Sequence, residues 1–499
     1  MKSSIDNNAE IIRNAGLNVK EEIFKFSKYT GITTALYTCG ISGACGYSAA
    51  LIFLVIFVAA FTNNNIYRAV VINSSSLISK DAAYDFLHST SANWRLFLGI
   101  IAKKIIVFCH ALTSRKHKKA IVFDDTSFKK NRSNKVELLS KCHDHVGNSY
   151  YKGFKNLNMV WTDGYTAIPL GYSLIASQYK NKRYNESTKD VDKRSNSYKR
   201  REEAINGKPK AVVNLIKFAQ SKIFKLFDVI LFDSWYASNF LISSCSKIAP
   251  VVCMLKKNSG LKFQFNNRNY NVEGIYRNLK KKPGKSRIIG SVLCKLVYNE
   301  NNEKIIVKIN VKIVFIRHRK TGDWIPILST QTKWSDEEIV KTYGMRWIIE
   351  VFHRDIKQFL NIETVCQSRD FDVIYGYIAL SYIQYIFISY RKRLHDDDRG
   401  IGELFYCCCE EIEEISFNDA YANLIYDAII LLKSMSFEAK DENNQNKLCV
   451  ELDVVENVLL KTIMSKISIA NAIRFLITGL NGCINIESKL AERLESEAA

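Results

Sequence analysis

The stretch "FDVILFDSWYASNFLISSCSKIAPVVCMLK", residues 227–256, contains two short apolar runs separated by a segment with helical spacing. "FDVILFDS" and "APVVCMLK" are apolar on both faces, which is typical of strands buried in a sheet, and "NFLISSCSK" between them predicts a helix. A strand, a helix and a second strand in this order predict an α/β fold whose sheet is covered by helices on its two sides.

The segments before this stretch extend the same pattern. "AIVFDDTSF" (120–128) predicts another buried strand, and "AVVNLIKFAQSKIF" (211–224) predicts a helix. Within "NLNMVWTDGYTAIPLGYSLIA" (156–176) two apolar runs flank Asp163-Gly164, a pair that favours a tight hairpin turn. Residues 116–255 are therefore expected to form the first part of an α/β core.

Acidic residues stand where two of these strands are expected to end. Asp124 and Asp125 follow "AIVF", and Asp233 follows "DVILF". Functional sites of open α/β sheets form at the carboxyl ends of strands, although a single acid there more commonly caps the next turn. These acids become informative only if a third carboxylate joins them.

The rest of the chain divides by composition. Residues 1–115 have helical spacing without proline, and we expect a helical region there. Residues 256–330 are basic and β-like, including "KFQFNNRNYNVEGIY", and predict an inserted β-rich subdomain. Residues 331–430 are expected to complete the catalytic core with a glutamate-bearing helix, and residues 431–499 to form a C-terminal helical region.

The net charge constrains the partner. The 499 residues include 71 Lys and Arg against 50 Asp and Glu, a formal net charge of +21. Such an excess favours a polyanion, either nucleic acid or an anionic membrane surface. The 13 cysteines are irregularly spaced, as expected for a reducing cytoplasm, and the polar N-terminus does not resemble a signal peptide.

One apolar run tests the membrane alternative. "AALIFLVIFVAAF" (49–61) is continuously apolar, and residues 29–67 contain no charged side chain between them. The run is shorter than the ~20 residues needed to span a bilayer. We therefore expect a buried helix of a helical domain, and keep a basic, membrane-anchored protein as a less favoured alternative.

The segment "YGMRWIIEVFHRDIKQFL", residues 343–360, predicts an amphipathic helix with an unusual polar stripe. At about 100° per residue, Arg346, Glu350, Arg354 and Lys357 share one narrow face, and the wide apolar arc predicts a largely buried helix. Arg346 and Glu350 could form only an i,i+4 ion pair. Alternatively, a carboxylate kept ionised by basic neighbours could bind a hard cation.

With the strand-end aspartates, Glu350 would complete a set of three carboxylates. Three carboxylates suffice to hold two Mg²⁺ ions, and two such ions roughly 4 Å apart suit an in-line attack on a phosphate. One ion activates the attacking oxygen and the other stabilises the leaving oxygen, so no histidine base is required.

Here the sequence resembles a known family. Tyr343, Arg346, Glu350 and Lys357 match the spacing of the Tyr-Arg-Glu-Lys signature of the insertion-sequence-four group of DDE transposases. "FDDTSFKK" and "LFDSWYAS" resemble the segments that hold this family's two catalytic aspartates, and the resemblance covers roughly residues 75–390. It implies an RNase H-like catalytic core with the β-rich insertion placed before the glutamate.

The resemblance implies site residues. Asp125, Asp233 and Glu350 would be the catalytic metal ligands for two Mg²⁺ ions, with Mn²⁺ as a substitute. Asp125 is preferred to Asp124 because it directly precedes Thr126 and so best matches the family's Asp-Thr pair, although strand alternation leaves both open.

It also implies how DNA is held. Tyr343, Arg346 and Lys357 would contact DNA phosphates, and Trp324 would stack on a flipped base unless it belongs to the core.

Two functions are compatible with these expectations. The first is a transposase of a bacterial insertion sequence that binds terminal inverted repeats and target DNA, cleaves and joins strands, and acts in the cytoplasm as a homodimer on paired ends. The second is a catalytically inactive DNA-binding protein derived from such an enzyme. The intact acids favour the first.

Overall fold

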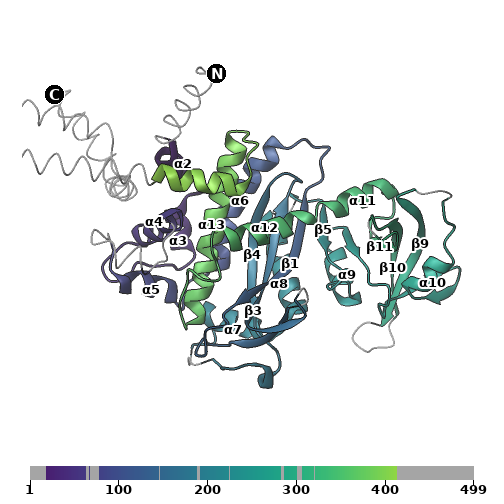
Figure 1. Cartoon of the computed structure of the whole chain (residues 1–499), viewed down its shortest axis with the longest axis horizontal. Helices are drawn as coiled ribbons and strands as arrows, with labels where there is room; N and C mark the ends of the chain where they lie inside the picture. The colour runs from purple at the N-terminus through teal and green to yellow at the C-terminus, as the bar shows by residue number, and fades with distance from the viewer. Residues whose placement is uncertain are drawn as a thin grey trace, which may run out of the picture. The chain divides into compact units, whose positions relative to one another are not determined.

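The computed structural model describes residues 18–62, 67, 78–144, 147–187, 191–223, 225–282, 286–299, 306–319 and 321–412. The chain divides into two compact units (Figure 1). Met1–Tyr37, Ser42–Phe86 and Asp398–Ala499 form the first unit, and Thr38–Ile41 with Leu87–Asp397 form the second. The C-terminal helical region expected at residues 431–499 lies outside the described residues.

The first unit is helical where it is described. Its helices are α2 (Asn18–Thr30), α3 (Ile32–Thr38), α4 (Ala49–Ala59), η1 (Ala60–Thr62) and most of α5 (Lys80–His88). The Ser48 hydroxyl caps α4 by accepting a hydrogen bond from the Leu51 amide, and most α4 side chains are buried. The helix expected over the apolar run is confirmed, and with 11 residues α4 is too short to span a bilayer.

The second unit is built on one mixed sheet of eleven strands, in agreement with the expected α/β class. The strand order is β2-β3-β1-β5-β6-β11-β10-β9-β7-β8, and β4 pairs with β3. The bounds are β1 (Ala120–Lys129), β2 (Ser140–Asp144), β3 (Ser149–Thr162), β4 (Ala167–Ile175), β5 (Val229–Phe232), β6 (Val251–Met254), β7 (Lys262–Phe265), β8 (Arg268–Tyr270), β9 (Ile288–Asn299), β10 (Ile306–Arg317) and β11 (Trp324–Ser329).

The predicted strands at the centre of this sheet are confirmed. Strands β1, β5 and β6 run parallel, and helix α9 (Asn239–Ser246) connects β5 to β6. Strands β3 and β4 are antiparallel around the Asp163-Gly164 turn, where Gly164 has a positive φ of 95°. Asp163 accepts hydrogen bonds from the amides of Tyr165 and Thr166, which closes the turn.

Helices pack on the sheet around β4. They are α6 (Trp94–Leu112), α7 (Asn196–Ile205), α8 (Lys208–Ile223), α12 (Trp347–Gln358) and α13 (Phe371–Leu394). Helix α11 (Asp336–Gly344) packs instead on β6, β9, β10 and β11, and the short η3 (Lys180–Lys182) follows β4 in the chain. Helix α12 crosses β1 and β4 (Figure 1). Helix α6 belongs to this unit, although residues 1–115 were expected to form a separate region. Of the described helices, α13 alone is long and apolar enough to cross a membrane, and that stretch is fully buried in the protein.

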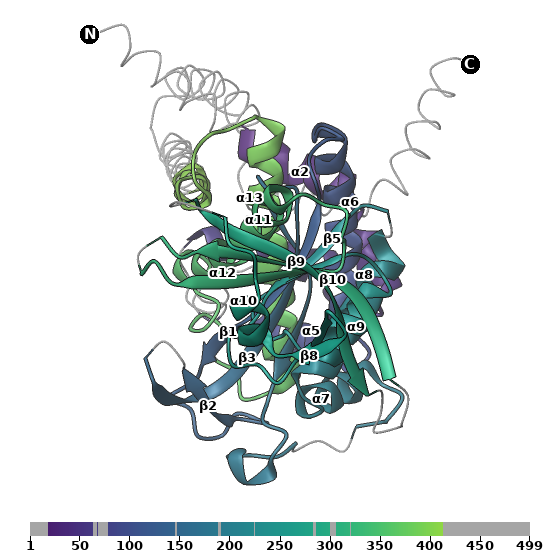
Figure 2. The same ribbon diagram turned by 90° about the vertical axis from the view of Figure 1, so that its right-hand side faces the viewer.

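The insertion extends the same sheet. Strand β11 pairs with β6, and the long antiparallel pair of β9 and β10 continues from β11 (Figure 2). The β-rich insertion also contains a short helix, α10 (Val272–Arg277), within a stretch whose composition is β-like. The Asn271 side chain accepts a hydrogen bond from the Gly274 amide, and this cap starts the helix within a segment that composition alone assigns to strands.

Trp324 lies in the packed part of this insertion. Its ring stacks on Tyr276 with a centroid separation of 4.4 Å and an interplanar angle of 13°, and Phe315 lies 5.7 Å away. The Nζ of Lys257 lies 4.7 Å from the Trp324 ring centre. The contacts of Trp324 are therefore those of an aromatic cluster inside the insertion.

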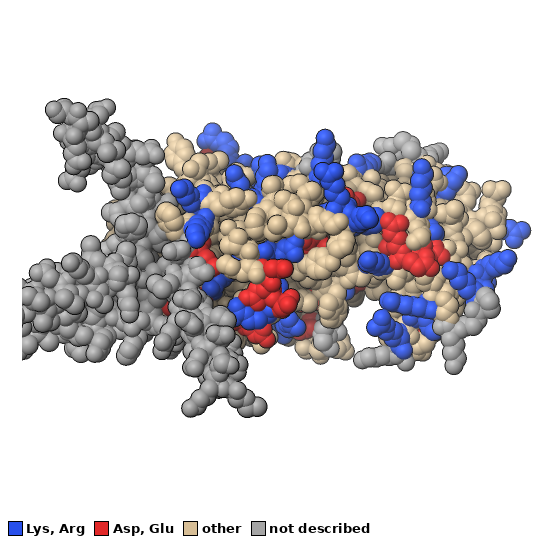
Figure 3. All heavy atoms as spheres, turned by 90° about the horizontal axis from the view of Figure 1, so that it is seen from above, with Lys and Arg blue, Asp and Glu red and all other residues tan. Residues whose placement is uncertain are grey.

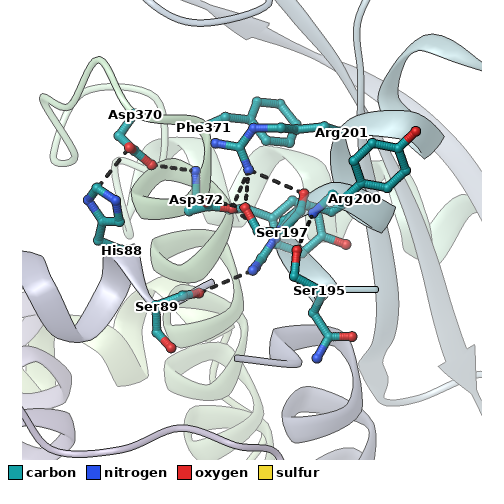
Figure 4. A network of polar contacts seen from close by, with 12 residues as sticks. His88, Ser89, Ser195, Ser197, Arg200, Arg201, Asp370, Phe371 and Asp372 are labelled. Atoms are coloured by element: carbon teal, nitrogen blue, oxygen red, sulfur yellow. Dashed lines mark hydrogen bonds and ion pairs between the residues drawn. The ribbon is translucent and has the colours of Figure 1, made fainter. Parts of the chain in front are cut away.

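A buried ionic network joins three distant segments of the second unit (Figure 4). Arg201 on α7 binds Glu137 through two nitrogens, at 2.7 and 2.8 Å, and Asp372 on α13 at 2.7 Å. Arg200 approaches the same Asp372 oxygen at 2.9 Å, and the Ser197 hydroxyl donates to the other one. Burial raises the pKa of Asp372, but the two guanidinium groups outweigh it and hold the carboxyl below its usual range.

Candidate active site

Two acidic residues contact the same arginine. Nη1 of Arg346 lies 3.1 Å from Oε1 of Glu350 and 3.4 Å from Oδ2 of Asp124. The two carboxylate oxygens can therefore be no further apart than these two distances added together. Burial lowers the pKa of Arg346, but Tyr343 and the charges of Asp233 and Asp124 raise it, so Asp233 also acts on this guanidinium. The structure thus brings Asp124 and Glu350 together at Arg346, and Asp233 is near enough to influence the charge of this guanidinium.

The position of the aspartates in β1 differs from the expectation. Asp124 and Asp125 lie inside the strand and not at its end, because pairing with β3 continues as far as Lys129. The parallel pairing with β5, however, stops at Phe123 and Phe232, directly before Asp124 and Asp233. Because β5 ends there, the edge of β1 that faces β5 has no strand partner beyond Phe123. Asp124 and Asp233 lie at this point.

Asp124 lies in an unfavourable electrostatic environment. Its side chain is 16% exposed. Burial raises the pKa of Asp124 to about 7, with further contributions from the charges of Asp125 and Glu350, and Arg346 offsets these only in part. Clustered carboxylates with a raised pKa gain the most from a nearby divalent cation, which favours their ionised form.

Asp125 has different partners. Its Oδ1 accepts hydrogen bonds from the Tyr236 hydroxyl and, at 2.7 Å, from Lys208, while Lys155 lies 3.8 Å from its Oδ2. Burial raises the pKa of Asp125, but Lys208, Tyr236 and Lys155 together lower it below the usual value. Asp125 is the carboxylate that the family resemblance favours as a metal ligand. Its negative charge is already balanced by basic side chains of the protein.

The donor set fits a hard divalent cation. Oδ1 of Asp233 is buried without a hydrogen-bond partner in the structure, and carboxylate oxygens are the ligands that Mg²⁺ prefers. No group of three His, Cys, Asp or Glu side chains within the described part of the chain is close enough to hold a metal ion, and Arg346 lies between Asp124 and Glu350. The oxygen ligands that these carboxylates offer therefore fit Mg²⁺. For Asp124 and Glu350 to bind the same ion, the Arg346 guanidinium would have to move away from them.

The helix expected over residues 343–360 is divided in two. Tyr343 lies at the end of α11, and Arg346 precedes α12. Hydrogen bonds from the Arg346 amide to the Tyr343 carbonyl and from the Ile349 amide to the Arg346 carbonyl span three residues and tighten the junction. Trp347, expected to be buried, is 67% exposed because the tightened junction turns it outward.

The basic residues of the signature lie beside the acids. The Arg346 guanidinium lies 6.0 Å from the Tyr343 ring centre. Lys357 donates to the Ser127 hydroxyl of β1 at 2.7 Å and lies 3.5 Å from Glu363, and burial lowers its pKa although Glu363 opposes this. Tyr343, Arg346 and Lys357 therefore follow the path of α11 and α12 past the catalytic strand.

Sequence reasoning missed a buried polar network behind Glu350. Nδ2 of Asn158, the residue paired with Asp124 in the sheet, lies 3.1 Å from Nε2 of His353, one turn after Glu350. The side-chain oxygen Oδ1 of Asn158 accepts a hydrogen bond from the Tyr382 hydroxyl, which itself accepts one from Nδ2 of Asn156 at 2.7 Å. The network connects β3, α12 and α13, whose residues are too distant in sequence for spacing to reveal. Tyr236, by contrast, stands within the quoted "LFDSWYAS".

His353 should make the stability of the fold pH-dependent. Burial lowers its pKa to about 3, with Lys357 and Arg346 acting in the same direction and Asp125 against it. Between about pH 6.5 and pH 3 the unfolded chain binds a proton at this residue and the folded chain does not. The free energy of unfolding therefore decreases as the pH is lowered through this range. Relative to pH 8, the loss from this residue at pH 5 should be ~2 kcal/mol.

The measurement compares urea unfolding of the wild type and His353→Gln at pH 8 and pH 5. The variant should lose less stability than the wild type between the two pH values. An equal loss in both proteins would show that His353 does not stay neutral in the folded state.

A comparison with protein families supports the chemistry of this site. The family model described as a transposase DDE domain matches residues 115–387, more than half of the chain. The matched range contains Asp124, Asp125, Asp233 and Glu350. A search of curated proteins gives no significant match. By this match, the chain belongs to the family of proteins with a transposase DDE domain.

Proposed function

We propose that this protein is the transposase of a bacterial insertion sequence, which binds terminal inverted repeats and catalyses metal-dependent strand cleavage and strand transfer. The observation that supports the proposal is the approach of Asp124 and Glu350 to Arg346, with Asp233 directly after the neighbouring strand β5, in a chain that belongs to the transposase DDE domain family. The finer assignment to the insertion-sequence-four group, with an RNase H-like core, rests on the Tyr-Arg-Glu-Lys spacing.

We assign the first metal ligand to Asp124 instead of Asp125. Asp124 lies on the side of Glu350, and burial together with the charges of Asp125 and Glu350 raises its pKa more than Arg346 lowers it. Asp125 is neutralised by Lys208, Tyr236 and Lys155. Two Mg²⁺ ions held by Asp124, Asp233 and Glu350, or Mn²⁺ in their place, would activate the attacking oxygen and stabilise the leaving oxygen of the phosphate.

The residues of the chain then have distinct roles. Arg346 neutralises Asp124 and Glu350 in the structure, and its planar fork is suited to a phosphate when the carboxylates bind metal. Lys357 provides a point charge near β1, and Tyr343 a hydroxyl at the end of α11. Asp125 holds Tyr236, three residues after Asp233, and so positions the segment that carries that ligand.

DNA is the polyanion that this function requires. The net charge of +21 supports binding through phosphate, and Figure 3 shows Lys and Arg dispersed over one face with Asp and Glu between them. We propose that residues 1–115 and the insertion contribute to the grip on duplex DNA, that the protein acts in the cytoplasm, and that two copies work on paired ends. Trp324 remains a candidate for base stacking only if the Tyr276 contact opens.

The experiment uses the purified full chain and a duplex that carries the DNA flanking its gene. With Mg²⁺ or Mn²⁺ we expect nicks at the element end, and with excess chelator we expect bound but uncut DNA. The catalytically inactive, DNA-binding alternative predicts binding without nicks under both conditions. A protein that neither binds nor cuts this duplex would contradict the transposase proposal itself.

A further inference from the structure

A basic groove of about 670 Å³ lies beside the catalytic strand. The β2–β3 hairpin, the segment after β4 and the start of α8 form it, and the hairpin is visible in Figure 2. We call it the hairpin groove. Lys141, Lys155, Lys182 and Lys208 line it, and none of the described residues that line it is Asp or Glu. Four positive charges without a lining carboxylate favour an anionic occupant.

Aromatic rings stand among these lysines. Tyr150 is 67% exposed and Tyr179 is 63% exposed, unusually high fractions for large rings that a folded protein would otherwise bury. The Nζ of Lys141 lies 4.4 Å from the Tyr150 ring centre, and that of Lys182 lies 5.1 Å from the Tyr179 ring centre. Alternating lysines and exposed rings suit a nucleic acid strand, because ammonium groups bind phosphates and rings stack on bases.

The hairpin groove extends as far as β1. Lys155 and Lys208 line its inner end, and both contact Asp125, the neighbour of Asp124. From Tyr150 to Lys155 strand β3 advances about 17 Å at ~3.4 Å per residue. A B-form strand advances the same distance in about five nucleotides. An occupant of the groove would therefore lie within a few nucleotides of a phosphate at the carboxylates.

We propose that the hairpin groove binds the DNA strand adjoining the scissile phosphate. Its lysines contact successive phosphates, and Tyr150 and Tyr179 contact the bases or sugars between them. This inference rests on the proposed function, since it takes DNA as the substrate, and it adds a binding surface outside both α12 and the insertion. Lys155 and Lys208 connect the groove to Asp125, which lies next to the proposed ligand Asp124 in the chain.

The first test is the double variant Lys141→Ala/Lys182→Ala, because neither lysine contacts Asp125. The matched control is Lys210→Ala/Lys217→Ala, which removes the same charge from exposed positions of α8 outside the groove. Binding of the flanking duplex is measured over a range of salt concentrations. With about 0.9 of a unit per phosphate contact, the groove variant should reduce the slope of log K against log salt by about 2 units.

Affinity at about 0.1 M salt should fall roughly tenfold or more in the groove variant and less than twofold in the control. Cleavage at saturating DNA should keep its rate in the control, whose substitutions lie outside the groove and away from the carboxylates. Equal losses in the two double variants, with wild-type unfolding temperatures, would overturn the groove and leave the proposed function standing. A wild type that binds no DNA would overturn both.

The second test locates the strand. The probe is the same duplex with 5-iodouracil at single positions within about five nucleotides of the cleavage site, irradiated in the bound complex. Crosslinks should form at Tyr150 or Tyr179, and Tyr150→Ala and Tyr179→Ala should each remove their own crosslink. Crosslinks confined to residues outside the hairpin groove would overturn the assignment.

Discussion

Glu350→Gln and Asp124→Asn should each reduce DNA cleavage by more than about a hundredfold while DNA binding survives. Both substitutions keep the size of the side chain and remove the charge that metal ligation needs. Loss of an outer contact to a metal ligand already costs roughly 10- to 100-fold, so loss of a ligand should cost more. Binding can improve, since each variant removes a negative charge facing the phosphates.

Asp125→Asn is the informative comparison. Asp125 is bound by Lys208, Lys155 and Tyr236, so its loss should disturb the position of the segment after Asp233 and lower cleavage less than Asp124→Asn does. Nicking of end-labelled duplex in Mg²⁺ measures all three. If Asp125→Asn were inactive and Asp124→Asn active, Asp125 would be the ligand.

A change of metal preference would separate ligation from structure. A thiolate is a softer ligand than a carboxylate and binds Mg²⁺ poorly. Asp124→Cys should therefore be inactive with Mg²⁺ and regain part of its cleavage with Mn²⁺. Cleavage by Asp124→Cys at the wild-type rate in Mg²⁺ would show that Asp124 does not hold the metal.

Asp372→Ala should destabilise the second unit by about 3–5 kcal/mol, the second large effect that the structure predicts. The substitution leaves the guanidinium groups of Arg200 and Arg201 buried without their shared carboxylate. Arg201→Ala should have a similar effect through Glu137, which is 2% exposed. Urea unfolding followed by far-ultraviolet circular dichroism measures both.

The control is Glu273→Ala, which breaks the exposed i,i+4 pair of Glu273 with Arg277. Exposed pairs contribute about 0–1 kcal/mol, so this variant should unfold close to the wild type. A loss below about 1 kcal/mol in Asp372→Ala as well would mean that water reaches the network in solution, and that it does not hold α7 to α13.

Local patterns predicted the elements whose partners are near in sequence. Strands β5 and β6, helix α9 between them and the β3–β4 hairpin were predicted correctly, because apolar periodicity and the Asp-Gly turn are local signals. Asp233 directly after β5 was predicted for the same reason. The length of β1 was not predicted, because the second half of this strand pairs with β3. No local sequence pattern identifies β3 as its partner.

The detail of the site depended on geometry that sequence does not contain. Period-two alternation places Asp124 and Asp125 on opposite faces, but only the position of α12 determines which face is catalytic. The break between α11 and α12 occurs among good helix formers, with Gly344 as its one local sign. The contacts of Lys208 and His353 join residues far apart in the chain, and spacing gave no sign of them.

The insertion is attached to the catalytic strands through a narrow seam. Strands β6 and β11 share three paired residues, whereas β9 and β10 share eleven. In mechanical terms, the long β9–β10 pairing makes the insertion stiff, and the short β6–β11 pairing makes its attachment to the rest of the sheet more compliant. Only helix α11, which packs on β6 and on the strands of the insertion, reinforces this short pairing among the described elements that contact both sides. The seam lies one strand away from β5, which ends directly before Asp233, so a change at the root of the insertion would be felt at that end of the sheet.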